Sequence, residues 1–303
     1  MPDPYIIVGL GEALWDVLPS GKHLGGAPLN SAYIASLLGN HAVIASRVGN
    51  DELGNEIRLE LDRRGLDTIA IQIDPELPTG TVDVKFQNGQ PEFEIKQPAA
   101  WDALEWSAQW DEVARSCDAA CFGSLAQRTP KSRSTILKFL EKTRPECLRV
   151  FDINLRKPFY SREVIESSLH RATILKLNDL ELPQVAALLD LQGDSVPALL
   201  RGLLEKFDLK VVLVTRGERG AIATNASEIV EHPGFTVRVC DTIGAGDAFG
   251  AAATHCLLAG MSLKKTLEVA NRWASWVASQ AGGMPQMSDE LRREMIGIAS
   301  ISA

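Results

Sequence analysis

Short apolar runs alternate along the chain with longer segments in which apolar positions recur every three or four residues. Several of the short runs are apolar at every position and rich in β-branched residues, which predicts strands buried on both faces. The predicted strands are Tyr5–Val8, Ala42–Val48, Ala119–Phe122, Arg149–Phe151, Thr173–Leu177 and Val211–Thr215. The predicted helices are Leu29–Leu38, Glu52–Arg64, Lys131–Lys142 and Val196–Lys206. Buried strands separated by helices predict an α/β fold with a mostly parallel, doubly wound sheet flanked by helices.

One region breaks this alternation. Val82, Val84 and Phe86 alternate with polar neighbours, which predicts a strand with one side facing solvent. The Asn-Gly pair at 88–89 then predicts a hairpin turn, and the chain returns over Glu92–Ile95. Such a hairpin does not belong inside a doubly wound sheet, so we expect a small flap that roofs a pocket. We find no repeat and no low-complexity linker, so residues 1–303 are predicted to form a single domain.

Composition and charge exclude several classes of protein. Of 303 residues, 45% are hydrophobic and 23% are charged, as in an ordinary globular protein. The formal net charge of −8 argues against a nucleic-acid partner, which needs clustered basic residues. The N-terminus has no basic segment, and no apolar run approaches about 18 residues. We therefore expect a cytoplasmic protein with no membrane partner, whose cysteines are buried, reduced thiols.

Familiar nucleotide and metal motifs are missing from the sequence. Gly9 and Gly11 are not followed by the third glycine of a dinucleotide-binding loop, because Leu14 stands there. No P-loop pattern occurs, and the scattered histidines form no metal-binding motif. An NAD-dependent reductase is therefore disfavoured.

The stretch Gly244-Ala245-Gly246 precedes a helix predicted from about Asp247 to Ala259. In an open α/β sheet, ligands bind where helices begin, and free N–H groups with the helix dipole attract anions there. Glycines let the backbone approach a phosphate closely. The alternative is that Asp247 is a helix-capping charge and the glycines only form a tight turn.

The pattern D-T-x-G-A-G-D over 241–247 resembles the C-terminal signature of the ribokinase-like, or PfkB, family of carbohydrate kinases. The resemblance implies that Gly244, Ala245 and Gly246 form the anion hole for the transferring phosphoryl group. It also implies that Asp247 is the base that takes the proton from the sugar hydroxyl.

The N-terminal third resembles the same family. Gly25-Gly26-Ala27-Pro28-Leu29-Asn30 is similar to the glycine-glycine sugar-binding motif in the form found in fructokinases, and Asp16 matches the sugar-binding aspartate. The resemblance implies that Asp16, Gly25, Gly26 and Asn30 hold the sugar. The alternative is that Asn30 caps a helix over Ser31–Leu38, and the two roles can coexist.

The middle of the chain carries the nucleotide-side resemblance. Residues 152–156 resemble the family's D-P-N-x-R segment, with Ile153 in place of proline, and this assigns Arg156 to the substrate. Asn178 and Glu181 match the N-x-x-E motif tied to Mg²⁺ through water, although the same pair suits a helix cap. The resemblance also implies that Asp241 lies beside a monovalent cation, for which K⁺ is the candidate. The other residues implied to bind the nucleotide are Thr215, Arg216, Gly217, Gly220 and Asn271.

The resemblance therefore implies an ATP- and Mg²⁺-dependent sugar kinase with a small β lid built from about residues 12–25 and 80–97. The GGAP form and Gly11-Glu12-Ala13 favour fructose as the sugar. Ribokinase, 2-keto-3-deoxygluconate kinase and nucleoside kinase activities stay open, as does an acceptor that already carries a phosphate. A non-catalytic sugar-binding regulator is the alternative from a different class, although it would not need Asp247. A homodimer that pairs through the lid is expected.

Overall fold

The computed structural model describes residues 3–18, 21–87 and 90–300. Within these residues a nine-stranded sheet runs through the centre, in the order β13-β12-β11-β10-β9-β8-β1-β4-β5. The strands are β1 (Ile6–Leu10), β4 (His41–Gly49), β5 (Ile71–Asp74), β8 (Ala119–Gly123), β9 (Leu148–Asp152), β10 (Ile174–Asn178), β11 (Val211–Thr215), β12 (Ala221–Thr224) and β13 (Ile229–His232). All neighbours from β5 to β11 are parallel, whereas β12 and β13 are added antiparallel at one edge.

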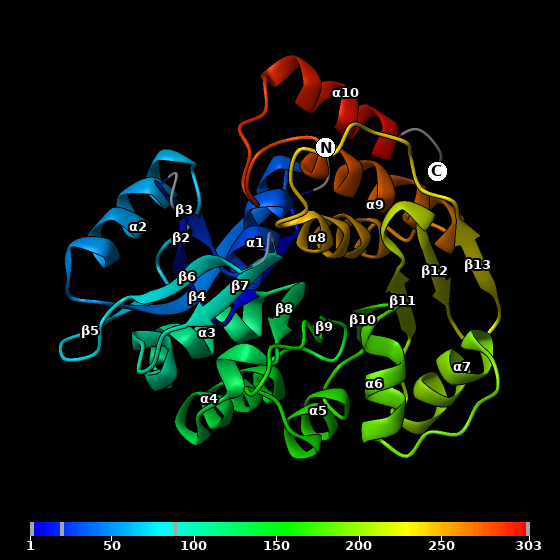
Figure 1. Ribbon diagram of the computed structural model, residues 1–303, viewed down its shortest axis with the longest axis horizontal. Helices are drawn as coiled ribbons and strands as arrows, with labels where there is room; N and C mark the ends of the chain where they lie inside the picture. Colours follow the sequence, from blue (N-terminus) through cyan, green and yellow to red (C-terminus); the bar gives the residue numbers. More distant parts are fainter. Residues whose placement is uncertain (1–2, 19–20, 88–89, 301–303) are drawn as a thin grey trace.

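Helices cover both faces of this sheet (Figure 1). One face carries α1 (Ala27–Leu37), α2 (Glu52–Arg63), α8 (Ala245–Leu258), α9 (Leu263–Ala278) and α10 (Asp289–Ser300). The other carries α3 (Ala108–Ser116), α4 (Pro130–Lys142), α5 (Arg162–Leu169), α6 (Glu181–Leu188) and α7 (Val196–Lys206). Within β11, Leu213 packs into the first layer while Val212 and Val214 pack into the second. This alternation explains why the strand is apolar over its first four residues, 211–214.

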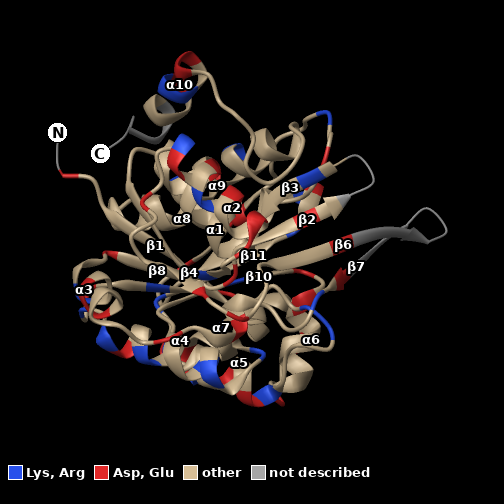
Figure 2. Ribbon diagram, turned by 90° about the vertical axis from the view of Figure 1, so that its left-hand side faces the viewer, with Lys and Arg blue, Asp and Glu red and all other residues tan. Residues whose placement is uncertain are grey.

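A second sheet of four strands projects from one edge of the molecule (Figure 2). Its order is β3 (Gly21–Gly25), β2 (Leu14–Leu18), β6 (Gly80–Gln87) and β7 (Gln90–Ile95). The strands β2 and β6 are parallel, and the outer pairs are antiparallel. The predicted hairpin over 81–95 is therefore confirmed, while its Asn-Gly turn at 88–89 lies outside the described residues.

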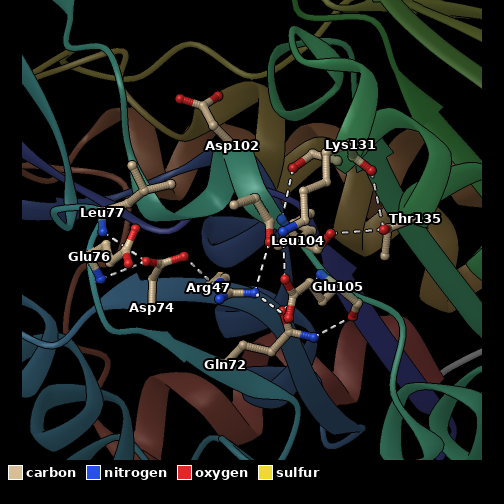
Figure 3. Close-up of polar contacts among 12 residues, drawn as sticks. Arg47, Gln72, Asp74, Glu76, Leu77, Asp102, Leu104, Glu105, Lys131 and Thr135 are labelled. Atoms are coloured by element: carbon tan, nitrogen blue, oxygen red, sulfur yellow. Dashed lines mark hydrogen bonds and ion pairs between the residues drawn. The ribbon is translucent and has the colours of Figure 1, made fainter.

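A polar network anchors the segment that follows the small sheet (Figure 3). Arg47, near the end of β4, lies 2.8 Å from Asp74 and 3.1 Å from Glu105, measured between nitrogen and oxygen. It also donates to the carbonyl of Ala103 at 2.9 Å. Because β5 ends at Asp74 and the segment with Ala103 follows β7, this arginine ties the exit of the small sheet to the edge of the large one.

The predicted doubly wound α/β architecture is confirmed, and the predicted strands are present with ends shifted by a residue or two. Three helix starts differ from expectation, and that of α4, at Pro130 rather than Lys131, differs by a single residue. Helix α1 begins at Ala27 rather than Leu29, because Pro28 suits its first turn, and α8 begins at Ala245 rather than Asp247. None of the helices in the described ranges combines the length and the apolar character needed to cross a membrane.

Candidate active site

The turn before α8 is built from glycines in close contact with a distant segment. Gly244 is the N-cap and has a left-handed backbone with φ of 75°. A side chain at this position would overlap Gly283, and a Cβ on Gly283 would lie 2.7 Å from Asn30 Nδ2. Glycine is thus required at both positions by close approach, and at Gly244 by conformation as well.

Asp247 lies in the first turn of α8 and is hydrogen-bonded to the N-terminal third of the chain. Asn30 Nδ2 donates to Asp247 Oδ2 at 2.8 Å. The other amide atom, Asn30 Oδ1, is buried and meets no donor among the described residues. Burial raises the pKa of Asp247, and Lys176, the Asn30 hydrogen bond and Arg156 oppose that rise.

Neither of these residues caps a helix in the expected way. Helix α1 has Gly26 as its N-cap, and the Asn30 backbone N–H donates to the Gly26 carbonyl at 2.9 Å. The proposed cap by Asn30 of a helix over 31–38 is therefore wrong. The N-cap of α8 is Gly244, and no side chain makes a capping hydrogen bond there. The Asp247 carboxylate is thus free for a role other than capping.

Sequence reasoning missed a buried ion pair beside this turn. Lys176 Nζ lies 3.0 and 2.9 Å from the two carboxylate oxygens of Asp152. The two residues stand on neighbouring parallel strands, β10 and β9, and Lys176 is 6% exposed. A lysine inside the apolar strand ILKLN was the available signal. Because lysine is almost never fully buried unless paired, it could have been singled out.

Two acidic residues gather at the sugar-motif glycines. A side chain at Gly25 would overlap the Asp16 carboxylate, and one at Gly26, whose φ is 111°, would overlap the Glu12 carbonyl. Burial raises the pKa of Asp16 to about 6, opposed by Arg156. Burial raises that of Glu12 to about 7. Glu12 Oε2 is buried and meets no hydrogen-bond donor in the described part of the chain.

Arg156 is exposed and follows β9. Its charge lowers the pKa values of Glu12, Asp16 and Asp247 against the effect of burial. One cation therefore lies near three carboxyl groups that come from three different segments. This arrangement brings Arg156 to the predicted sugar side.

Asn178 and Glu181 form reciprocal hydrogen bonds where α6 begins. Asn178 Oδ1 accepts from the Glu181 N–H, and Glu181 Oε2 accepts from the Asn178 N–H, both at 2.8 Å. Glu181 Oε1 also accepts from the Leu155 N–H at 2.7 Å, which joins α6 to the loop that carries Arg156. The capping arrangement is therefore present, and each carboxylate oxygen retains a lone pair for a water molecule.

A cavity of about 610 Å³ opens on the other side of the α8 turn. Four of the predicted nucleotide residues line it together with two from the turn: Thr215, Gly217, Gly220, Asn271, Ala245 and Gly246. Its apolar wall includes Val237, Val239, Phe249, Ala274 and Ala278. Arg216 is not part of this lining, since its guanidinium lies 2.9 Å from Glu231.

The Asp241 side chain accepts two backbone hydrogen bonds in the loop region before α8. Its Oδ1 accepts from the Ile243 N–H at 2.9 Å, and its Oδ2 accepts from the Gly282 N–H at 3.1 Å. No group of three or more acidic, histidine or cysteine residues suited to a metal ion occurs among residues 3–18, 21–87 and 90–300. Mg²⁺ that is shared with substrate phosphates needs only one or two protein carboxylates, so Glu181 fits such an ion.

The fold is that of the ribokinase-like sugar kinases. A Pyrococcus horikoshii protein named as a sugar kinase, solved in complex with ATP, has a TM-score of 0.78 and 26% identity, covering 97% of this chain and 99% of that chain. The fructokinase of Vibrio cholerae, solved with fructose, ADP and calcium, has a TM-score of 0.79 and 23% identity, covering 96% and 99%.

The family model of the pfkB family carbohydrate kinases matches residues 19–290, and the chain belongs to this family. The P. horikoshii protein is 31% identical over 278 residues, which are 89% of this chain and 85% of that protein. The fructokinase of Salmonella typhimurium is 29% identical over 301 residues, covering 91% and 94%. The predicted family membership and carbohydrate kinase class are therefore confirmed.

Proposed function

We propose that this sugar kinase transfers the γ-phosphoryl group of ATP to a hydroxyl of a monosaccharide, with fructose as the favoured acceptor and Asp247 as general base. The observation that carries the proposal is the position of Asp247. Its carboxylate accepts a hydrogen bond from Asn30 of the sugar motif, while the adjoining Ala245 and Gly246 line the 610 Å³ cavity. A base between a sugar site and a nucleotide site is what direct transfer requires.

In the proposed reaction, the hydroxyl oxygen forms a bond to the γ-phosphorus while its proton passes to Asp247. The bond from phosphorus to the β–γ bridging oxygen breaks, and ADP leaves with that electron pair. The N–H groups of the α8 first turn, at Ala245 and Gly246, would stabilise the charge on the transferring group, and the Ala245 N–H would give up its 3.3 Å hydrogen bond to the Thr242 carbonyl. Gly244 provides the left-handed turn that directs them.

The sugar would be held by Asp16, Gly25, Gly26, Asn30 and Arg156. Asn30 Oδ1 supports this assignment, because a buried amide oxygen without a donor is completed by a sugar hydroxyl. The small sheet would act as a lid, formed by about residues 12–25 and 80–97 of a single domain spanning 1–303, and would exclude water that hydrolyses ATP.

The 610 Å³ cavity would take the adenosine part of ATP, with its apolar wall against the base and Asn271 at its edge. Asn178 and Glu181 would hold Mg²⁺ through water; when bound, that ion supplies charge neutralisation between phosphates. Asp241 would lie beside K⁺. Thr215, Gly217 and Gly220 would contact the nucleotide directly, whereas Arg216 would have to leave Glu231 to do so.

The relatives named fructokinase and the GGAP motif support fructose. A coupled assay of ADP release with fructose, ribose, 2-keto-3-deoxygluconate, adenosine and fructose 6-phosphate tests this assignment. We expect fructose to give the highest kcat/KM. If another acceptor gives the highest kcat/KM, it replaces fructose as the proposed substrate, and the proposed transfer mechanism stands. Absence of a phosphorylated product with all acceptors would leave the sugar-binding regulator.

A homodimer is also proposed, with the two lids paired. Val17, on β2 of the small sheet, is an exposed apolar side chain there. Sedimentation of the wild type and of Val17→Lys tests it. We expect a dimer that the lysine weakens, and a wild-type monomer at micromolar concentration would contradict it.

A further inference from the structure

The ion pair of Lys176 and Asp152 is buried at an unusual place. Both side chains stand near the carboxyl ends of central strands, β10 and β9, where the first turn of α8 crosses the sheet. Replacing a buried ion pair by apolar residues is often neutral or stabilising, so such a pair is weak evidence for a role in stability. Its position next to Asp247 calls for a different explanation.

Lys176 lies directly against the glycine turn. A Cβ built on Gly246 would lie 3.0 Å from Lys176 Nζ, and one on Gly250 would lie 4.0 Å from Asp152 Oδ2. Glycine at 246 therefore gives room to the ammonium group as well as to an anion on the other side of the turn. Asp152 holds this ammonium by contact with both of its carboxylate oxygens.

The charged groups around Asp247 come from several elements. Lys176 from β10 and Arg156 from the loop after β9 favour its ionised form, and Lys176 is the stronger of the two. The carboxyl groups that lie close to this cluster are Asp152 on β9, Glu12 after β1, Asp16 on β2 and Glu181 on α6, and burial raises the pKa of the first three. Asn30 from α1 supplies the neutral donor. In this acidic surrounding, Lys176 is the buried positive charge.

We propose that Lys176 and Asp152 form a positioning pair for phosphoryl transfer: Lys176 keeps the Asp247 carboxylate ionised so that it can accept a proton, and Asp152 fixes the Lys176 ammonium against Gly246. The inference rests on the proposed function of Asp247. The two members of the ion pair then act on the base in opposite ways. Lys176 attracts the negative charge of Asp247, and Asp152 repels it.

The test is the dependence on pH of kcat at saturating sugar and ATP, which falls on the acid side as Asp247 becomes protonated; protonation of Asp16 acts on the sugar KM instead. Lys176→Met removes a positive charge, raises the pKa of Asp247 and should move the acid limb to higher pH by about one unit or more. Asp152→Asn removes a negative charge and should move that limb to lower pH. Lys176→Arg should keep the wild-type limb, with lower kcat because of its larger head group. The control is Lys265→Met, which removes a lysine paired with Glu268 on α9. It should change neither the position of the acid limb nor kcat.

If the pair is purely structural, Lys176→Met and Asp152→Asn should both lower the melting temperature. The acid limb should then stay in place in both variants, or move in the same direction in both. That result would overturn the inference. If Lys176→Met does not fold, Lys176→Gln takes its place, and the acid limbs of Lys176→Gln and Asp152→Asn are compared in the same way. Asp247→Asn is assayed in parallel. If that variant keeps wild-type turnover, the proposed function fails first; if it loses turnover while the limbs stay fixed, only the positioning pair fails.

Discussion

Asn30 and Asp247 are 217 positions apart in the chain, and Asn30 Nδ2 donates a hydrogen bond to Asp247 Oδ2 at 2.8 Å. The glycine-glycine motif of α1 and the glycine turn of α8 therefore form one hydrogen-bonded unit. Because the Asn30 Oδ1 atom has no donor among the described residues, this unit has capacity for a further hydroxyl.

The first prediction concerns the base. Asp247→Asn should lower kcat by about 10²–10⁴-fold, the usual contribution of general-base catalysis. The melting temperature should not fall, because a buried charge with a raised pKa is removed. Steady-state kinetics and thermal unfolding measure both, with Asp289→Asn in the first turn of α10 as the matched control. Turnover within a few-fold of wild type in a folded protein would contradict the mechanism.

The second prediction concerns the sugar. Asp16→Asn should raise the sugar KM by about 10- to 100-fold, since a hydrogen bond to a charged group contributes about 1.5–3 kcal/mol. The KM for ATP should change little. In the wild type, sugar affinity should fall as pH decreases through about 6, where Asp16 becomes protonated. Equal loss of sugar and ATP affinity would assign Asp16 a structural role instead.

The third prediction concerns stability. Burial raises the Glu12 pKa from 4.5 to about 7, so the folded protein binds its proton more tightly than the unfolded chain does. This contribution is fully present below pH 4.5 and is lost as pH rises through 7, at a cost on the order of 3 kcal/mol. Glu12→Gln should therefore raise the free energy of unfolding at about pH 8 and change it much less near pH 5. Denaturant unfolding at both pH values measures it, and equal effects would contradict the assignment.

The fourth prediction concerns the nucleotide cavity. Ala274 lines the cavity from α9, and Ala274→Trp would occupy part of its 610 Å³. We expect a KM for ATP at least about tenfold higher, with sugar binding retained. The control is Ala259→Trp at the exposed end of α8. Unchanged ATP affinity in a folded Ala274→Trp protein would place the nucleotide elsewhere.

The fifth prediction concerns the lid. Amide hydrogens of β6 and β7 should exchange more slowly when a saturating sugar substrate is present, because closure over the site protects them. Hydrogen exchange followed by mass spectrometry measures this. The strands of the large sheet provide the internal reference, and equal protection of β6 and β7 with and without sugar would indicate a static sheet.

The sequence predicted the strands β1, β4, β8, β9, β10 and β11 and the helices α1, α2, α4 and α7, because burial on one or both faces leaves a direct periodic signal, as in VVLVT of β11. The strand β5 and the helices α3, α5, α9 and α10 were not predicted. The glycine motifs could also be recognised, because their residues lie close together in the sequence. The antiparallel edge strands β12 and β13 were not expected, because four-residue strands give little periodicity. The pairing of Lys176 with Asp152 was missed for another reason: it depends on which strands become neighbours in the sheet, and that is settled by long-range packing.

The contact of Gly244 with Gly283, and of Gly283 with Asn30, has a consequence for protein synthesis. The ribosome makes the glycine-glycine motif early, but the proposed base, Asp247, and the turn proposed to bind phosphate emerge near the end of translation. A nascent chain that has not yet released residue 283 therefore lacks the surface on which the turn rests. A product that ends between Arg156 and Asp247 would keep the residues proposed to bind the sugar and would lack the proposed base.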